Sequence, residues 1–301
     1  VYPVDFVYNK DEIHVPLSEK KSTLSLQAAH DLVAMGETKT IIIEGNGVKI
    51  IIPEGTLGEG ADINNIIADV SDIIPGPHMV VAYTDIDGVM HIVPWSITEE
   101  GLVTYIVNCM GTYSVISNEI TFLDTADHWG RDWITFVAAR EMFNGTGEGK
   151  FSPELPMNRA MIVTVLHRLV GLHEAEPCGL GDVLEDQWYT EAVDWAVASG
   201  ISTGDGKGNF GVEVNITREE LAVMLYRYSE YIGEEVLEEG SLEGFTDTGE
   251  ISEYAVAAMG WTTNVGIIKG RTVTELDPKG QATRAEVTTM LARYIEWVLS
   301  K

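Results

Sequence analysis

The sequence predicts a multi-domain protein: a β-rich domain over residues 1–118, followed by an all-helical region built from three repeats. Runs of β-branched residues joined by glycine-containing turns dominate the first part, a pattern typical of strands and hairpins. From Phe122 onward, apolar residues recur at helical spacing, and one pattern occurs three times in the same register. These observations assign a different fold class to each part.

The first part contains two hairpin signatures, a further strand pair and one helical segment. "KTIIIEGNGVKIIIP", residues 39–53, places a glycine-rich turn between two β-branched runs. "MVVAYTDIDGVMHIVPW", residues 79–95, repeats the pattern around Asp87-Gly88. "GLVTYIVNCMGTYSVIS", residues 101–117, predicts another strand pair around Gly111, and "STLSLQAAHDLVAMG", residues 22–36, predicts a helix. Together they predict a sandwich-like domain with one helix.

The helical region consists of three stretches that align without gaps, beginning at His128, Gln187 and Glu253. Trp129 recurs 59 residues later as Trp188 and, 66 residues after that, as Tyr254. The other matching columns are Phe136/Trp195/Trp261, Gly145/Gly204/Gly270, Phe151/Phe210/Leu276, Arg159/Arg218/Arg284, Leu166/Leu225/Leu291 and Arg168/Arg227/Arg293. An acidic turn precedes each stretch and ends at Asp124, Asp182 or Asp247. Agreement in so many columns indicates internal duplication.

These repeats resemble S-layer homology (SLH) domains, the cell-wall anchoring repeats of bacterial surface proteins. The resemblance is carried by the leading F-x-D, the H-W or Q-W pair, the "GISTG" and "GIIKG" steps, and the "TREE" and "TRAE" motifs. It places the three repeats at residues 119–172, 173–240 and 241–301. Residues 1–118 resemble no family in the same way.

The resemblance implies a pseudo-threefold trimer of repeats within one chain, with no catalysis and no cofactor. It also implies binding to secondary cell-wall polysaccharide in grooves between repeats, commonly through a pyruvate ketal on an amino sugar. The protein is accordingly expected outside the cell, on a bacterial cell wall, where self-assembly is a further open interaction. Because the sequence begins at Val1 without Met or a signal peptide, it is expected to be part of a longer protein.

The composition limits the partners. Forty-seven acidic residues against nineteen basic ones give a formal charge of −28, which disfavours nucleic acid and anionic membranes as general partners. No apolar run reaches the about 18 residues of a membrane-spanning helix. Cys109 and Cys178 have neither metal-site spacing nor the density of a disulfide framework, and no metal site is predicted. An anionic ligand therefore requires a local basic pocket.

An arginine follows the helix-capping residue of every repeat, at Arg159, Arg218 and Arg284. Thr217 and Glu220 form a capping box, as do Thr283 and Glu286, which explains the threonines and glutamates but not the arginines. A guanidinium fork matches the two oxygens of a carboxylate. The residues alone leave two roles open: a ligand contact, or an ion pair with the aspartate before a neighbouring repeat. The family resemblance favours the ligand.

The glycine-rich loops offer bare amide N–H groups that can form an anion-binding concavity, whereas tight turns with positive φ are the alternative. The third copy keeps only its first glycine. Trp129 and Trp188 could stack on a sugar ring, although core packing is commoner for tryptophan; Trp195 and Trp261 are assigned to the core. The candidate ligand-binding residues are Arg159, Arg218, Arg284, Asp124, Asp182, Asp247, Trp129, Trp188, Gly145, Gly204, Gly206 and Gly270.

Two other functions remain open beside the predicted non-catalytic anchor. The repeats could assemble a surface lattice without binding glycan. Alternatively, residues 1–118 could form an enzyme, which would need a cluster such as His78, His91 and Asp85 to converge in a pocket. No nucleophile or metal-ligand motif supports catalysis. For the anchor, Arg218→Ala is expected to weaken wall binding and to leave the melting temperature near that of wild type.

Overall fold

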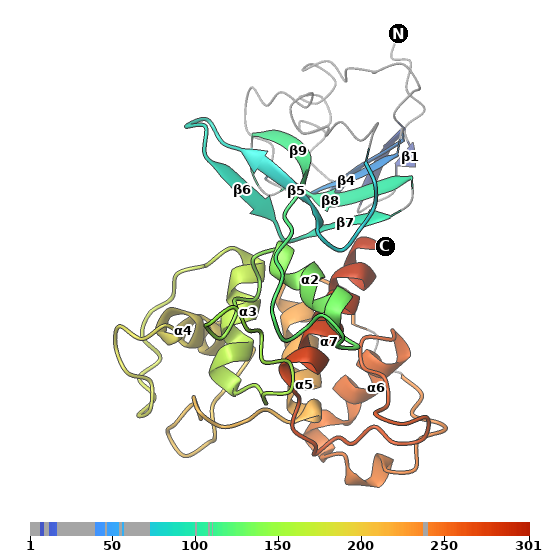
Figure 1. Ribbon diagram of the computed structural model, residues 1–301. Helices are drawn as coiled ribbons and strands as arrows, with labels where there is room; N and C mark the ends of the chain where they lie inside the picture. The colour runs from blue at the N-terminus through green and yellow to red at the C-terminus, as the bar shows by residue number, and fades with distance from the viewer. Residues whose placement is uncertain are drawn as a thin grey trace. The chain divides into compact units, whose positions relative to one another are not determined.

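The computed structural model describes residues 7–8, 12–16, 40–45, 47–53, 56, 73–99, 101–107, 109, 111–236 and 240–301. The chain forms two compact units, which we call the β unit and the helical unit (Figure 1). The β unit comprises residues 1–120 and 138–141, and the helical unit comprises residues 121–137 and 142–301. The strands precede the helices along the chain, which confirms the predicted order of a β-rich part before a helical part.

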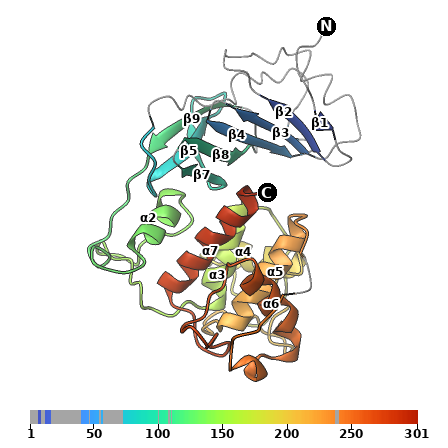
Figure 2. The same ribbon diagram turned by 90° about the vertical axis from the view of Figure 1, so that its right-hand side faces the viewer.

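The described part of the β unit contains two sheets (Figure 2). The larger sheet has the strand order β1-β2-β3-β4-β8-β7 and the smaller has the order β6-β5-β9. The strands are β1 (Val7–Tyr8), β2 (Glu12–Pro16), β3 (Thr40–Gly45), β4 (Val48–Pro53), β5 (Met79–Thr84), β6 (Met90–Val93), β7 (Ser96–Glu99), β8 (Leu102–Ile106) and β9 (Thr112–Ser117). The β2–β3 and β4–β8 pairs are parallel, and the other neighbours are antiparallel.

Both predicted hairpins form because their turn residues suit the backbone. β3 and β4 pair antiparallel across a turn in which Gly47 has a φ of 78°. β5 and β6 pair antiparallel across a turn in which Gly88 has a φ of 79°. There the Asp85 carboxylate accepts hydrogen bonds from the N–H groups of Asp87 and Val89. Glycine adopts such positive φ values without the steric cost that other residues meet.

The third predicted strand pair is wrong in its pairing, although both strands exist. β8 lies between β4 and β7 in the larger sheet, whereas β9 pairs with β5 in the smaller one. β5 is the central strand of the smaller sheet: β6 and β9 pair with its two edges, and Val80, Val81 and Ala82 of β5 are buried. The partner of β9 is therefore a strand far away in sequence, β5, and not its neighbour in sequence, β8. The helix predicted for residues 22–36 lies outside the described residues.

Each repeat contains two α-helices, and all of their residues except Ala138 and Ala139 belong to the helical unit. The first helices are α2 (Arg131–Ala139), α4 (Thr190–Ala198) and α6 (Val256–Asn264), and the second helices are α3 (Arg159–Val170), α5 (Arg218–Tyr231) and α7 (Arg284–Leu299). Two short 3₁₀ helices, η2 (Thr248–Glu250) and η3 (Glu253–Ala255), precede α6. In both views α3, α5 and α7 lie together in the middle of this unit (Figures 1 and 2).

The predicted capping residues start the second helices. The Thr217 side chain accepts the N–H of Glu220, and the Glu220 carboxylate accepts the N–H of Thr217, which completes the capping box of α5. Thr283 and Glu286 do the same for α7. Asn158 caps α3 alone, through the N–H of Met161 at 2.9 Å. In each case the column arginine is therefore the first residue of the helix.

The apolar columns of the repeat form the core. Trp195 and Trp261 are 2% and 1% exposed, as predicted. The other fully buried columns are Phe151/Phe210/Leu276 and Leu166/Leu225/Leu291. Burying side chains of this size contributes about 1.5–3 kcal/mol each. α5 and α7 meet through Tyr228 and Tyr294, whose ring centroids are 6.0 Å apart.

Backbone hydrogen bonds join the three repeats in a closed cycle. Met157 N–H donates to Ala282 O at 3.0 Å, Ala282 N–H donates to Ile216 O at 3.0 Å, and Ile216 N–H donates to Met157 O at 2.8 Å. These residues share one column, two positions before the arginine of each repeat. The segment that leads into each second helix is thus held by the other two repeats.

Candidate functional site

The three column arginines each contact the loop of another repeat, in the same cyclic order. Nε of each guanidinium donates to a backbone carbonyl oxygen of a single column: Arg159 to Phe210 at 3.0 Å, Arg218 to Leu276 at 2.7 Å and Arg284 to Phe151 at 2.8 Å. The first repeat thus reaches the second, the second reaches the third, and the third returns to the first. The arginines lie at the junctions between repeats, where the sequence predicts grooves.

The partners of these guanidinium groups differ from the aspartates considered from sequence. Among the described residues, none of the three arginines forms a salt bridge with Asp124, Asp182 or Asp247. The charges of Asp247 and Asp124 act on Arg218 and Arg284 only from a longer distance. Glu220 Oε1 instead lies 3.5 Å from Arg159 Nη1, and Glu286 Oε1 lies 3.7 Å from Arg218 Nη1. The capping-box glutamates therefore have a second role beside the guanidinium of the preceding repeat.

Arg218 is the most deeply buried of the three arginines. The Arg218 side chain is 2% exposed and that of Arg159 is 13% exposed. Burial lowers the pKa of Arg218, although the Glu286 carboxylate opposes this change, and burial lowers the pKa of Arg284 to about 10. Arg218 also donates from Nη2 to Lys269 O at 2.6 Å. Because Arg218→Ala would leave the buried carbonyl group of Leu276 without its charged donor, we expect it to lower the melting temperature.

A cleft of about 250 Å³ opens beside Arg159, and all three repeats contribute to its walls. Its polar and aromatic lining includes Arg159, Ser202, Gly204, Glu220, Arg227 and Tyr254. Arg159 Nη2 donates to Ser202 Oγ at 2.8 Å, in addition to the bond from Nε. These bonds use two of the five guanidinium N–H groups. Nη1 lies 3.5 Å from Glu220 Oε1, and the remaining N–H groups are left for a ligand in the cleft.

Tyr254 supplies an aromatic wall from the third repeat, and 60% of this residue is exposed. Its hydroxyl donates to Glu219 Oε1 at 3.1 Å, and Glu219, which is 2% exposed, also accepts from Lys279 Nζ at 2.6 Å. Burial, followed by the Glu219 carboxylate, raises the pKa of Tyr254 to about 12, so the hydroxyl remains a donor at neutral pH. An aromatic ring held at one end and exposed at the other can contact a sugar.

The three predicted aspartates hold the loops of their own repeats. The Asp182 carboxylate accepts the N–H groups of Phe210, Gly211 and Val212 at distances of 2.6 to 3.0 Å. Asp124 and Asp247 accept in the same way from Phe151 and Ser152 and from Leu276 and Asp277. Burial opposes ionisation, but these bonds outweigh it, and the pKa of each carboxyl is lowered. None of the three lines the cleft beside Arg159.

Backbone geometry accounts for most of the loop glycines. Gly204 and Gly206 have φ values of 77° and 72°. Gly145 and Gly270 lack positive φ, but a Cβ on either would collide with backbone oxygen atoms of its own loop. In the second loop the N–H groups of Lys207 and Asn209 donate to the Asp205 carboxylate at 2.7 and 3.0 Å. The predicted anion-binding concavity there holds a carboxylate of the loop itself, and of the four predicted glycines only Gly204 lines the cleft.

The aromatic column lies on the surface. Trp129 and Trp188 are 62% and 57% exposed, so the core position that the sequence favoured for them is wrong. Tyr254 occupies the same column and was not among the predicted site residues, although its place in the column was visible. Glu220 was also missed, because the capping box explained it fully from sequence. Only contacts between repeats reveal that these two residues share a cleft with Arg159.

The β unit brings part of the alternative enzyme cluster together. His91 Nε2 lies 2.9 Å from Asp85 Oδ2, and the His91 ring stacks on Tyr83 with 4.9 Å between centroids. Among the described residues, His78 is bonded to neither of them. Cys109 and Cys178 are half-buried free thiols. No described helix is long and apolar enough to cross a membrane.

The fold and the cleft define a class of protein: a helical module of three repeats that interlock in a cycle and leave a cleft at a junction. The C-terminal region belongs to the S-layer homology domain family, whose model matches residues 121–160, 181–222 and 244–288. The three matches fall on the three repeats, so the predicted resemblance is confirmed.

The chain is also similar to parts of much longer proteins. It is 31% identical over 183 residues to the exoglucanase XynX of Acetivibrio thermocellus, covering 60% of this chain and 17% of that protein. It is 29% identical over 197 residues to an amylopullulanase of Thermoanaerobacterium thermosulfurigenes, covering 65% and 10%. It is 28% identical over 158 residues to the surface-layer 125 kDa protein of Lysinibacillus sphaericus, covering 52% and 13%. The chain thus spans only a small part of these relatives, and the family indicates a location at the bacterial cell surface.

Proposed function

We propose that the helical unit is a non-catalytic anchor that binds an anionic cell-wall polysaccharide and so retains a larger secreted protein on the bacterial surface. The observation that carries the proposal is the cleft beside Arg159, where a guanidinium with unused donors and an exposed tyrosine ring meet. The first group suits an acidic substituent such as a pyruvate ketal, and the second suits a sugar ring. Membership of the S-layer homology domain family supports this reading.

The local charge of the cleft favours an anion despite the net charge of −28. Arg159 and Arg227 line the cleft together with one carboxylate, that of Glu220. Because Arg159 Nε already donates to Phe210 O, a ligand carboxylate would approach the terminal Nη atoms of the guanidinium. One charge-assisted hydrogen bond of this kind contributes about 1.5–3 kcal/mol.

We also propose that the three repeats are related by a pseudo-threefold axis and that the two sheets pack as a sandwich. The cyclic backbone bonds among Met157, Ile216 and Ala282 support the first statement. The hydrogen bond from Val81 N–H in β5 to Ser96 Oγ in β7, at 3.3 Å, supports the second because it joins strands of different sheets.

Binding to purified cell walls tests the proposal, with the walls used before and after chemical removal of their secondary polymer. We expect wild type to bind intact walls and to lose binding on stripped walls. Arg159→Ala should weaken binding to intact walls about 10- to 100-fold, from the loss of one charge-assisted contact. Tyr254→Ala should weaken it about 3- to 10-fold, from the loss of one aromatic contact.

Arg131→Ala is the matched control, because Arg131 is exposed and its hydrogen bond goes to the adjacent Asp132. This variant should bind as wild type does. Equal binding of wild type to intact and stripped walls would overturn the glycan proposal and favour assembly of the repeats on the surface. Thermal melting of each variant separates a lost contact from a lost fold.

A further inference from the structure

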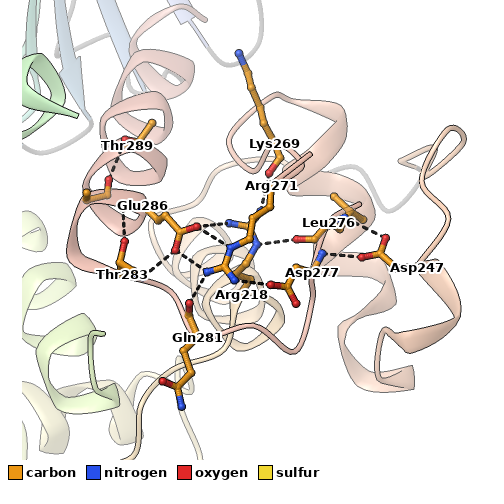
Figure 3. A network of polar contacts seen from close by, with 11 residues as sticks. Arg218, Asp247, Lys269, Arg271, Leu276, Asp277, Gln281, Thr283, Glu286 and Thr289 are labelled. Atoms are coloured by element: carbon orange, nitrogen blue, oxygen red, sulfur yellow. Dashed lines mark hydrogen bonds and ion pairs between the residues drawn. The ribbon is translucent and has the colours of Figure 1, made fainter. Parts of the chain in front are cut away.

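The residue that follows Gly145, Gly204 or Gly270 makes different contacts in the third repeat than in the first two. This position holds Thr146, Asp205 and Arg271 in the three repeats. Thr146 Oγ1 donates to Lys150 O of its own loop at 3.3 Å, and the Asp205 carboxylate accepts N–H groups of its own loop. Arg271 instead extends to the first turn of α7, at the junction that contains Arg218 (Figure 3).

Arg271 is fixed there by a bidentate ion pair. Its Nε and Nη2 atoms donate to the two carboxylate oxygens of Glu286, each at 2.8 Å. Nη2 also donates to Gln281 O at 2.6 Å, and Nη1 pairs with the Asp277 carboxylate. Two parallel N–H bonds to one carboxylate form a directional and comparatively strong contact.

Glu286 is the counterpart of Glu220, which lines the open cleft beside Arg159. Arg218 is the counterpart of Arg159, and its Nη1 lies 3.7 Å from the same Glu286 carboxylate. Arg271 therefore lies on the third repeat's side of the junction that contains Arg218. The equivalent junction, beside Arg159, contains an open cleft. The low exposure of the Arg218 side chain, 2% against 13% for Arg159, agrees with a covered junction.

The sequence around Arg271 leaves room for it. Position 280 is glycine, whereas the matching positions of the other repeats hold Leu155 and Val214. A Cβ on Gly280 would collide with the Asp277 carboxylate and with Arg271 Nη1. This glycine has no positive φ, so its absence of a side chain serves space and not backbone conformation. A larger residue would displace the Arg271–Asp277 pair.

We propose that Arg271 is a built-in plug that closes the Arg218 junction to the glycan, whereas the equivalent junction beside Arg159 stays open to it. The inference rests on the proposed function, because it states which junctions between repeats can bind the glycan. Replacing Arg271 with the threonine of the first repeat removes both bonds to Glu286. The change uncovers Arg218 in an arrangement like that around Arg159.

Nuclear magnetic resonance of the arginine side chains tests the plug. The probe is a methyl glycoside of an N-acetylated amino sugar that carries a pyruvate ketal. In wild type we expect the probe to shift the Nε–H resonance of Arg159 and to leave that of Arg218 unchanged. In Arg271→Thr both resonances should shift, and calorimetry should show one more binding equivalent than in wild type.

Gly280→Val is the second variant, because it displaces Arg271 without replacing it, and it should show the same gain. A shift of the Arg218 resonance in wild type would overturn the plug. So would two folded variants in which the probe shifts the Arg159 resonance as in wild type and leaves the Arg218 resonance unchanged. An Arg159 resonance that the probe leaves unchanged in wild type would overturn the proposed function itself, and this inference with it. Thermal melting confirms that each variant is folded before titration.

Discussion

Arg284 and Phe151, which lie 133 residues apart in sequence, meet at two points: Arg284 Nε donates to Phe151 O at 2.8 Å, and the guanidinium carbon lies 4.4 Å from the Phe151 ring centroid. This contact returns the chain from its third repeat to its first. With the equivalent contacts of Arg159 and Arg218, it makes each repeat depend on another for the partners of its loop. The arginines predicted as ligand contacts are thus also part of the framework.

Arg284→Ala should destabilise the helical unit strongly. The substitution removes the bonds to Phe151 O and to Asn144 O, the latter at 2.8 Å, and the ring contact. We expect a loss of about 3 kcal/mol in the free energy of unfolding, because the buried carbonyl group of Phe151 and the carbonyl group of Asn144 both lose a charged donor. Urea denaturation followed by circular dichroism measures it. The exposed Arg131→Ala variant should lose no more than about 0.5 kcal/mol; equal losses in the two variants would show that the third-to-first contact adds nothing to stability.

The loop aspartates should make stability depend on acid pH. The folded-state pKa of Asp124, Asp182 and Asp247 is lowered from the ordinary value of 3.8. A carboxyl whose pKa is lower in the folded state stabilises the fold fully above its unfolded value and loses this contribution as pH falls through the folded value. The melting temperature should therefore fall below about pH 4. Asp182→Asn should be less stable than wild type at neutral pH and should show a shallower acid decline.

An exposed carboxylate provides the control for that series. Asp132 lies at the start of α2, and its side chain is 71% exposed. Asp132→Asn should reproduce the wild-type pH profile. An Asp182→Asn profile parallel to that of wild type would show that the bonds from Phe210, Gly211 and Val212 do not stabilise the charged form.

The features that the sequence predicted correctly are those decided by local chemistry. The capping boxes at Thr217 and Thr283 and the hairpin at Asp87-Gly88 depend on residues within a few positions of one another. The repeat columns were visible because three copies could be compared. The burial of Trp195 and Trp261 followed from their position in a helical apolar pattern.

The features that the sequence missed depend on contacts between repeats. Nothing near Arg271 in the sequence indicates that Glu286, rather than solvent, is its partner. The arginine columns suggested carboxylate partners, but the main acceptors are backbone carbonyls, which no residue type reveals. Likewise, Tyr254 lines the cleft because Glu219 holds its hydroxyl, and that contact joins the second repeat to the third. Repeat columns therefore gave the candidates, and the packing of the repeats selected among them.

Gly270→Ala should destabilise the third repeat, because this glycine is required for space. Gly270 has no positive φ, but an added Cβ would collide with the backbone oxygens of Thr272 and Glu275, which cannot move without disturbing the loop. We expect a loss of about 2 kcal/mol in the free energy of unfolding. Gly249→Ala is the matched control: Gly249 also lacks positive φ, and its Cβ would meet nothing within 4 Å, so it should be neutral or slightly stabilising. Urea denaturation of both variants measures the difference, and a Gly270→Ala variant as stable as wild type would show that this loop tolerates a side chain at the column glycine.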